Sequence, residues 1–481
     1  MARDHHESRS DVRSAAVSLL RVGAVATFLL SAAALMLVST PAQAVPPFAR
    51  QTGLACEACH TVPPELTPFG RRFKLNGYTL TTRPPLVSDT DDHKKNTLWL
   101  SDLPGLGVLF QATYNHYDRA PPDSAVPGAK SQSENLEFPQ QFSLIAGGAI
   151  TDQIGGFLQM TYDQPSGTFG VDNTDLRYSD HTQNNDFVWG VLFNNNPGNQ
   201  DVWNSVAAYP TLDFSNQSLW SAGGAGGAGL TSAFFEGLGG LTAGPTAYIW
   251  YKDSFYLGIS EYHAAVSGSG TSTLDSTNLS AGGGALQGWA PYWRAAYERD
   301  WGYNSASVGV SGMYSRFTPA LIAGQTLDPG FINRYLDISY DWQYQYIGQH
   351  NIFSFLGRYT REKADHDPGL VPTYYSNRSD NFDQWNVTGT YFYNRHYGAL
   401  VNFVHASGTP DAAILGGNGS PGYQYEVLEL DYLPWLNFRF ILQYNIYNVV
   451  KNNQNPFILL NATNPQASNN NTFVFGLWMD F

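Results

Sequence analysis

The sequence predicts an all-β fold, an antiparallel outer-membrane β-barrel of about sixteen strands preceded by a small N-terminal segment. Three observations predict it. Aromatic residues make up 14% of the 481 residues and charged residues only 14%, whereas soluble domains usually carry about 25% charged residues. Short segments of alternating polar and apolar residues recur from about residue 105 onward. The connections between them alternate between short turns and long loops, as they do in outer-membrane barrels.

The predicted strands number sixteen, and an even number keeps both termini of the barrel chain on the periplasmic side of the membrane. They cover residues 104–116, 136–150, 154–163, 172–180, 186–193, 247–252, 255–263, 288–301, 304–315, 332–345, 351–362, 384–394, 397–406, 423–434, 437–448 and 472–481. Alternation is clear in the fifteenth, where Phe440, Leu442 and Tyr444 share one face and Arg439 and Gln443 share the other. A soluble β-sandwich or propeller is the alternative. The absence of a blade-length repeat and the alternating loop lengths favour the barrel.

A barrel of sixteen strands is wide enough for an aqueous channel unless something plugs it. The segment 45–102 is large enough to be that plug. Alternation along the strands predicts that a set of charged residues faces the lumen. These are Arg294, Glu298, Asp337, Asp341, Arg358, Glu429, Asp431 and Arg439. We expect them to pack and solvate the interior rather than to take part in redox chemistry.

Residues 1–44 have the pattern of an export signal. An apolar run from Val22 to Val38 follows several arginines, and Pro41 to Ala44 form a small-x-small cleavage pattern. A permanent membrane helix is the alternative, but the run is short for about 30 Å of hydrocarbon. We therefore expect a signal peptide (1–44), an N-terminal segment (45–102) and a barrel (103–481) in the bacterial outer membrane. The net charge of −14 argues against nucleic-acid binding, which depends on Lys and Arg.

The chain has only two cysteines, and they lie in the sequence Cys56-Glu57-Ala58-Cys59-His60. This C-x-x-C-H pattern attaches haem c, because two thiols add to the porphyrin and the following imidazole binds the iron. A disulfide is the default for cysteines in an exported chain. A zinc site needs further ligands at matching spacing, and a thioredoxin-type pair needs a βαβ surround. We therefore expect one covalently attached haem c, with His60 as the proximal ligand.

The sixth ligand of the haem iron stays open at this stage. No methionine lies between residues 45 and 100, and the only other histidine there is His93. The candidates are His93, Lys74, a residue of the barrel wall, or water. His93 lies in a polar run, which favours a solvated side chain at this position over a ligand.

A longer stretch around the haem motif resembles the beginning of a known family. It runs from Phe48 to His60 and continues with Pro64, Leu66, Phe69, Gly70, Arg71, Phe73, Lys74, Gly77 and Tyr78. This stretch resembles the fused monohaem cytochrome c–porins of the outer membrane of iron-oxidising bacteria, the outer-membrane iron oxidases. The similarity covers about thirty residues and is more specific than C-x-x-C-H alone.

The resemblance implies a single-chain conduit for electrons. It implies Fe(II) as the extracellular electron donor and a periplasmic c-type cytochrome or copper protein as the acceptor, with the barrel in contact with outer-membrane lipid. It also implies residues that pack around the porphyrin or pair with its propionates. These are Phe48, Arg50, Phe69, Arg71, Phe73 and Tyr78. We expect a monomer, because a closed barrel leaves no free strand edge, although porins also trimerise.

Two alternatives to iron oxidation remain for the function. Related chains are expected in organisms that do not oxidise iron, so the conduit could serve a different donor or acceptor. A solute porin in which the haem segment is a structural plug is a second class of function. Asp365, His366 and Asp367 in a predicted outer loop are candidate iron contacts, but a solvated polar loop is the favoured interpretation of these three residues.

Overall fold

The computed structural model describes one compact unit of the chain, Val45–Phe481. Within it, the described residues are 47–61, 63, 65–80, 105–118, 133–163, 168–184, 186–203, 242–264, 273–274, 284–319, 330–415, 418–451 and 467–481. The predicted signal peptide 1–44 and His93 lie outside the described residues. Those two predictions therefore stay predictions, as does the end of the N-terminal segment at residue 102.

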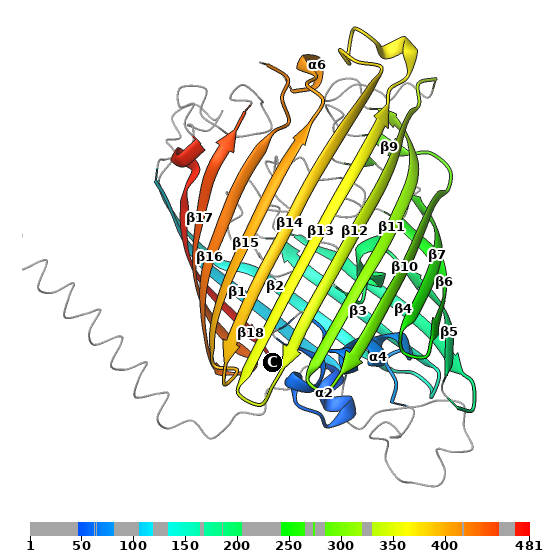
Figure 1. Ribbon diagram of the computed structural model, residues 1–481, viewed down its shortest axis with the longest axis vertical. Helices are drawn as coiled ribbons and strands as arrows, with labels where there is room; N and C mark the ends of the chain where they lie inside the picture. The colour runs from blue at the N-terminus through cyan, green and yellow to red at the C-terminus, as the bar shows by residue number, and fades with distance from the viewer. Residues whose placement is uncertain are drawn as a thin grey trace, which may run out of the picture. The chain divides into compact units, whose positions relative to one another are not determined.

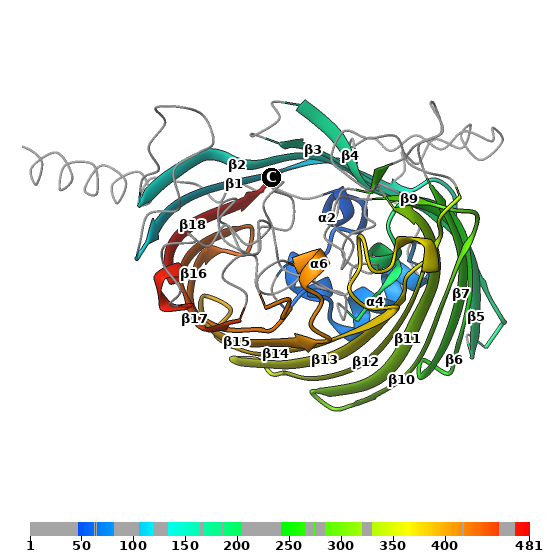
Figure 2. The ribbon, with the colours of Figure 1, turned by 90° about the horizontal axis from the view of Figure 1, so that it is seen from above.

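Sixteen long antiparallel strands form a closed barrel (Figure 1; Figure 2). They are β1 (Leu106–Tyr117), β2 (Glu134–Ala149), β3 (Ile154–Asp163), β4 (Thr168–His181), β5 (Phe187–Asn194), β6 (Thr242–Tyr251), β7 (Phe255–Ala264), β10 (Ala290–Trp301), β11 (Asn304–Pro319), β12 (Asn333–Ile347), β13 (Asn351–Asp365), β14 (Ser379–Tyr393), β15 (Tyr397–Gly408), β16 (Tyr423–Trp435), β17 (Phe438–Val450) and β18 (Thr472–Asp480). Each pairs with its neighbour in sequence, β7 pairs with β10, and β1 pairs with β18 to close the ring. The predicted fold class and strand number are confirmed. Two short strands, β8 (Thr273–Leu274) and β9 (Gly284–Leu286), add a small hairpin beside β11.

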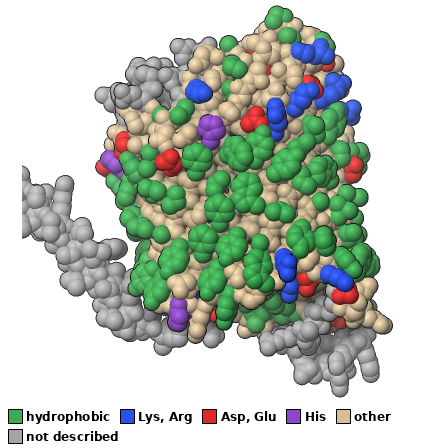
Figure 3. All heavy atoms as spheres, in the orientation of Figure 1, with side chains coloured by type: hydrophobic (Ala, Val, Ile, Leu, Met, Phe, Trp, Pro, Cys, Tyr) green, Lys and Arg blue, Asp and Glu red, His purple; other side chains and the backbone are tan. Residues whose placement is uncertain are grey.

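The strands alternate between an exposed apolar face and a buried polar face. In β17, Leu442 is 40% exposed, while Arg439 and Gln443 are buried. All eight charged residues that were predicted to face the lumen are buried, which confirms that prediction. Figure 3 shows hydrophobic side chains spread over the outer surface of the strands, with charged side chains gathered toward the two ends. This period of two is what a barrel needs when its outside faces lipid.

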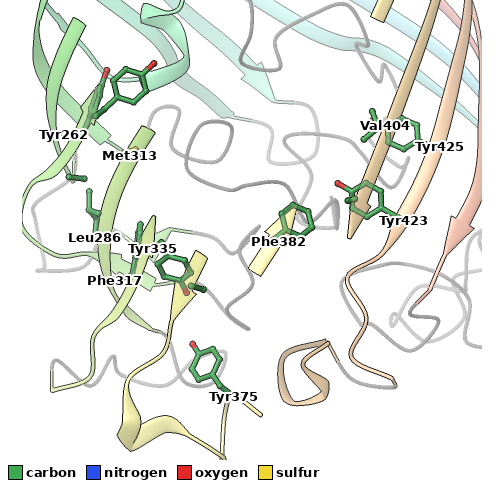
Figure 4. Packing of buried hydrophobic residues seen from close by; sticks show 14 of the residues in the cluster. Tyr262, Leu286, Met313, Phe317, Tyr335, Tyr375, Phe382, Val404, Tyr423 and Tyr425 are labelled. Atoms are coloured by element: carbon green, nitrogen blue, oxygen red, sulfur yellow. The ribbon is translucent and has the colours of Figure 1, made fainter. Parts of the chain in front are cut away.

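The two ends of the barrel differ in their connections. Short turns join the strands at one end, and two of them have positive φ at both central residues: Lys252 and Asp253, and Asn394 and Arg395. This is the backbone of the type I′ hairpin, whose twist matches that of the flanking strands. The C-terminus lies at this short-turn end (Figure 1). At the other end, the long-loop end, buried rings such as Tyr335 and Phe382 form a cluster inside the barrel (Figure 4).

In the described part of the chain ahead of the barrel, the structure contains three short helices: α2 (Pro47–Thr52), α3 (Cys56–Cys59) and α4 (Pro68–Leu75). Viewed along the barrel, α2 and α4 lie inside the ring of strands (Figure 2). None of the helices in the described part of the chain is long and apolar enough to cross a membrane. The N-terminal segment is therefore built from small helices that occupy the short-turn end of the barrel.

Candidate haem-attachment site

The haem motif folds as one helical turn followed by an extended residue. Cys56 and Cys59 are the first and last residues of α3, and residues three apart lie on the same face of a helix. Both cysteines are half-buried, and they are not joined by a disulfide. His60 is extended, half-buried, and donates its backbone N–H to the carbonyl of Cys56 at 2.9 Å. Two thiols and one imidazole therefore come from a single turn.

The two thiols of this turn are harder to deprotonate than a free cysteine. Burial raises the pKa of Cys59 to about 11, with a further contribution from Cys56. Burial and the negative charge of Asp480 raise the pKa of Cys56. Catalytic redox cysteines need the opposite, a pKa lowered by positive charge or a helix N-terminus. The pair therefore does not have the properties of a thioredoxin-type site.

Helix α4 holds the haem motif in place through its first turn. Thr67 donates its backbone N–H to the carbonyl of Cys59 at 2.9 Å and its hydroxyl to the carbonyl of Ala58 at 2.7 Å. The same hydroxyl accepts the N–H of Gly70 at 3.1 Å, which caps the helix. A Cβ on Gly70 would lie 2.2 Å from the carbonyl oxygen of Cys59. Only glycine allows α4 to approach the motif so closely.

Neither Thr67 nor Gly70 was assigned a role from the sequence. A Thr-Pro pair ahead of a helix is a recognisable N-cap, so the cap could have been found. The contact between Gly70 and Cys59 could not, because it depends on the angle between α3 and α4.

The predicted aromatic residues lie together. Phe48 stacks on Tyr78 with ring centroids 5.0 Å apart and meets the edge of Phe73 at 5.4 Å. Phe157 of β3 extends this group at 6.3 Å from Phe48. Phe69 is 39% exposed instead, so it is the aromatic residue of the set with the most surface free for a ligand. Contact of these residues with a porphyrin stays a prediction.

Arg71 lies against the barrel wall. It is completely buried, and its guanidinium binds both carboxylate oxygens of Glu298 in β10 at 2.8 and 2.9 Å. It also donates to Ser305 of β11, to Gln343 and Gln345 of β12, and to the carbonyl of Leu66. Pairing of Arg71 with a haem propionate was predicted. The geometry disfavours it, because every guanidinium nitrogen already donates to a buried acceptor.

Other residues of the segment contact strands around the ring. Gln51 accepts the backbone N–H of Ala149 at the end of β2, and the Tyr78 hydroxyl donates to Asp175 of β4 at 2.8 Å. The carboxylate of Glu65, fully buried, accepts hydrogen bonds from Gln345 of β12 and Ser354 of β13. Burial raises the pKa of Glu65. The segment is thus fixed to strands on several sides of the barrel.

At the edge of the short-turn end, Glu57 pairs with Arg395 of the β14–β15 turn at 3.2 Å. Arg50 is half-buried at the end of α2. Lys74, a candidate sixth ligand, is half-buried in α4, and its charged neighbours include Arg177 and Asp175 of β4. Burial lowers the pKa of Lys74 to about 8.

A loop from the long-loop end reaches Glu298, the buried carboxylate that pairs with Arg71. After β5, the chain forms the 3₁₀ turn η2 (Pro197–Gln200) and places Trp203 in the interior, where it is 2% exposed. Its indole N–H donates to Glu298, the partner of Arg71. Its ring also lies 5.0 Å from the guanidinium of Arg294. The N-terminal segment and this loop therefore meet inside the barrel from opposite ends.

The residues present fit a c-type haem. Two unbridged cysteines on one face of a helical turn, followed at once by a half-buried histidine, are the donor set that the attachment requires. Among the described residues no group of three metal-ligand atoms gathers at the two cysteines, which disfavours a zinc site. Cys56, Cys59 and His60 are the residues that would hold the group.

No family model matches this chain, and no curated protein matches it. Among solved structures, the chain is similar to OmpF of Salmonella typhi in complex with daunomycin, with 13% identity over 78% of this chain and 97% of that chain and a TM-score of 0.44. It is similar to a loop-deletion mutant of OmpT of Vibrio cholerae, with 10% identity, coverage of 78% and 98%, and a TM-score of 0.43. It is also similar to an anion-selective porin from Comamonas acidovorans, with 13% identity over 78% of this chain and 98% of that chain and a TM-score of 0.42. Likeness at this level carries no argument about function.

Proposed function

We propose that this chain is an outer-membrane electron-transfer protein. Its barrel spans the membrane, and its N-terminal segment carries one haem c on Cys56 and Cys59 with His60 as the axial ligand. One observation carries the proposal: the segment with the C-x-x-C-H motif lies inside the barrel and is held there by the buried pair of Arg71 and Glu298. A covalent redox group fixed in a transmembrane barrel is the minimum that electron transfer across this membrane requires.

The exterior of the barrel supports the membrane location. The described strands pair into a ring that β1 and β18 close, so none of the sixteen is an edge strand, as a lipid environment demands. Outward side chains in the strands are apolar and exposed, for example Ile259 at 61% and Leu430 at 58%. In bacterial outer-membrane barrels the short turns face the periplasm and the long loops face outward. By that rule the haem segment lies at the periplasmic end.

This orientation assigns the two sides of the electron path. A periplasmic c-type cytochrome or copper protein can approach the haem segment directly at the edge formed by Glu57 and Arg395. Fe(II) as the donor follows from the resemblance of residues 48–78 to the outer-membrane iron oxidases. Fe(II) would lose one electron to become Fe(III), and the periplasmic carrier would gain that electron. When bound, the haem supplies the one-electron chemistry between them.

The test adds Fe(II) anaerobically to the oxidised full-length protein in outer-membrane vesicles and follows the reduced haem bands. We expect the bands to appear with Fe(II), and a Cys56→Ser/Cys59→Ser variant to show no haem bands. If dithionite reduces the haem but Fe(II) does not, the iron donor is excluded while the conduit for another donor or acceptor remains.

A solute porin with a structural plug is the second candidate. The charged lumen favours it: Arg294 pairs with Asp341 at 2.8 Å, and Arg439 binds both Glu429 and Asp431. Facing charges of this kind can sort ions in a water-filled pore. Conductance in planar bilayers separates the two functions. Large, steady currents from the haem-loaded protein would support the porin and contradict a closed conduit.

A further inference from the structure

Three buried ligand-type side chains meet at the long-loop end of the barrel. His366 directly follows β13, Asp380 is the second residue of β14, and Asp411 lies just after β15. One ligand atom from each lies within 4.8 Å of the others. The three residues are 1%, 0% and 1% exposed. We refer to them as the loop triad.

The surrounding residues hold the loop triad rigidly. The His366 Nε2 lies 2.9 Å from an oxygen of Asp380, and the other oxygen of Asp380 accepts the side-chain amide of Asn377 at 2.8 Å. The His366 ring stacks on Tyr375 at 3.8 Å between centroids. Asp411 accepts the backbone N–H groups of Ser376, Asn377 and Ala413. Supporting contacts of this kind orient the ligands in metal sites.

The charges of the loop triad do not balance within it. Two carboxylates carry two negative charges, so even a protonated His366 leaves a net charge of −1 among the three. Buried carboxylates are stable when they are paired or bind a metal ion. In addition, the Nδ1 atom of His366 is buried and has no hydrogen-bond partner among the described residues. A buried imidazole and two buried carboxylates whose ligand atoms lie within 4.8 Å of one another form a donor set that suits a cation.

We propose that His366, Asp380 and Asp411 bind one divalent first-row transition-metal ion. One imidazole nitrogen and two carboxylate oxygens suit ions such as Zn²⁺, Mn²⁺ and Fe²⁺, whereas Ca²⁺ and Mg²⁺ prefer oxygen ligands alone. The ion would replace the direct contact between His366 and Asp380 and would neutralise both carboxylates. It would also tie together the ends of three strands, β13, β14 and β15.

This site is distinct from the haem segment. β13 has 15 residues, which at about 3.3 Å per residue is a strand of roughly 50 Å between the short-turn end and His366. An ion in the loop triad is therefore too far from Cys59 to be in contact with the haem. The site would bind or concentrate a metal ion at the outer end of the barrel, and it does not depend on the proposed electron transfer.

The loop triad changes the interpretation of the outer loop. Of the three residues suggested there as iron contacts, only His366 belongs to the triad. Asp365 is partly exposed and pairs with Lys363 at 3.2 Å, as a solvated loop predicts. Asp367 caps the 3₁₀ turn η3 (Pro368–Leu370) by accepting the N–H of Gly369. The expectation of a solvated side chain was wrong for His366, because its ring is packed under Tyr375.

The test is a calorimetric titration of the full-length protein, purified in detergent without a histidine tag, with Zn²⁺ as a redox-inert probe. We expect one site of stoichiometry near one in the wild type. Asp380→Asn keeps the shape of the side chain but removes its charge and should weaken binding at least tenfold, since even supporting residues of metal sites change affinity about 10–100-fold. The matched control is Asp365→Asn, a neighbouring carboxylate outside the triad, which should bind within twofold of the wild type.

Two results would overturn the proposal: a wild type that binds no Zn²⁺, or an Asp380→Asn variant that binds it as tightly as Asp365→Asn does. The second result would mean that the triad is only an ion pair that holds the loops. Folding of each variant is checked by the heat-dependent gel shift of folded barrels. If Asp380→Asn fails that check, His366→Gln is judged by the same tenfold criterion.

Discussion

Replacing Arg71 by methionine should loosen the N-terminal segment inside the barrel. The change removes the cation but leaves Glu298 buried at 1% exposure. Breaking a buried ion pair by removing one partner costs about 3–5 kcal/mol, because a charge is left without compensation. At about 1.4 kcal/mol per factor of ten, this shifts the equilibrium between the closed and the displaced segment by roughly 10²-fold to 4 × 10³-fold.

The assay is single-channel conductance of the full-length protein in planar bilayers. Wild type should be closed nearly all the time, and Arg71→Met should show frequent open events. Arg72→Ala is the matched control: its side chain is 41% exposed and its two ion pairs are 3.3 Å long, and exposed pairs contribute at most about 1 kcal/mol. A double variant, Arg71→Met with Glu298→Gln, should recover part of the closure. If Arg71→Met conducts no more than Arg72→Ala, the segment is not held by this pair.

Three further predictions test other parts of the structure. Gly70→Ala should impair haem attachment, because its Cβ would lie 2.2 Å from the Cys59 carbonyl oxygen. The haem absorbance per protein should fall well below that of the control Gly389→Ala, because Gly389 has open space around its Cβ position. Lys74 has a pKa of about 8 in the folded protein instead of 10.5. The unfolded chain therefore binds more protons between these pH values, and the free energy of unfolding should rise with pH across that window. Lys74→Met should reduce the slope of the free energy of unfolding against pH, as measured by urea titrations. An unchanged slope would mean that another group causes the pH dependence. Leu428→Arg, at the middle of β16 on the exposed face, should destabilise the barrel in lipid vesicles by about 2–4 kcal/mol, and a negligible loss would mean that this face is not in the bilayer.

Much of the fold could be predicted from the sequence because the strands carry a period of two. Arg439 and Gln443 on one face of a segment and Leu442 on the other already define the lumen and the exterior. The short turns between consecutive strands indicated that neighbours in sequence pair and that they run antiparallel. The short β8–β9 hairpin was not predicted, because two or three residues are too few to show a period.

The candidate site was predictable only in its local part. Cys56, Cys59 and His60 are adjacent in sequence, so their shared turn follows from spacing. The pairing of Arg71 with Glu298 joins residues 227 positions apart, and only barrel closure brings them together. The loop triad is similar, since His366 and Asp411 meet because β13, β14 and β15 end at the same level.

The intact mass of the full-length protein, isolated from cells that mature c-type cytochromes, tests the central claim most directly. We predict the mass of the processed chain plus one haem, and a Cys56→Ser/Cys59→Ser variant with the mass of the polypeptide alone. A wild-type protein with the bare polypeptide mass, with two free thiols or a disulfide between Cys56 and Cys59, would contradict the account.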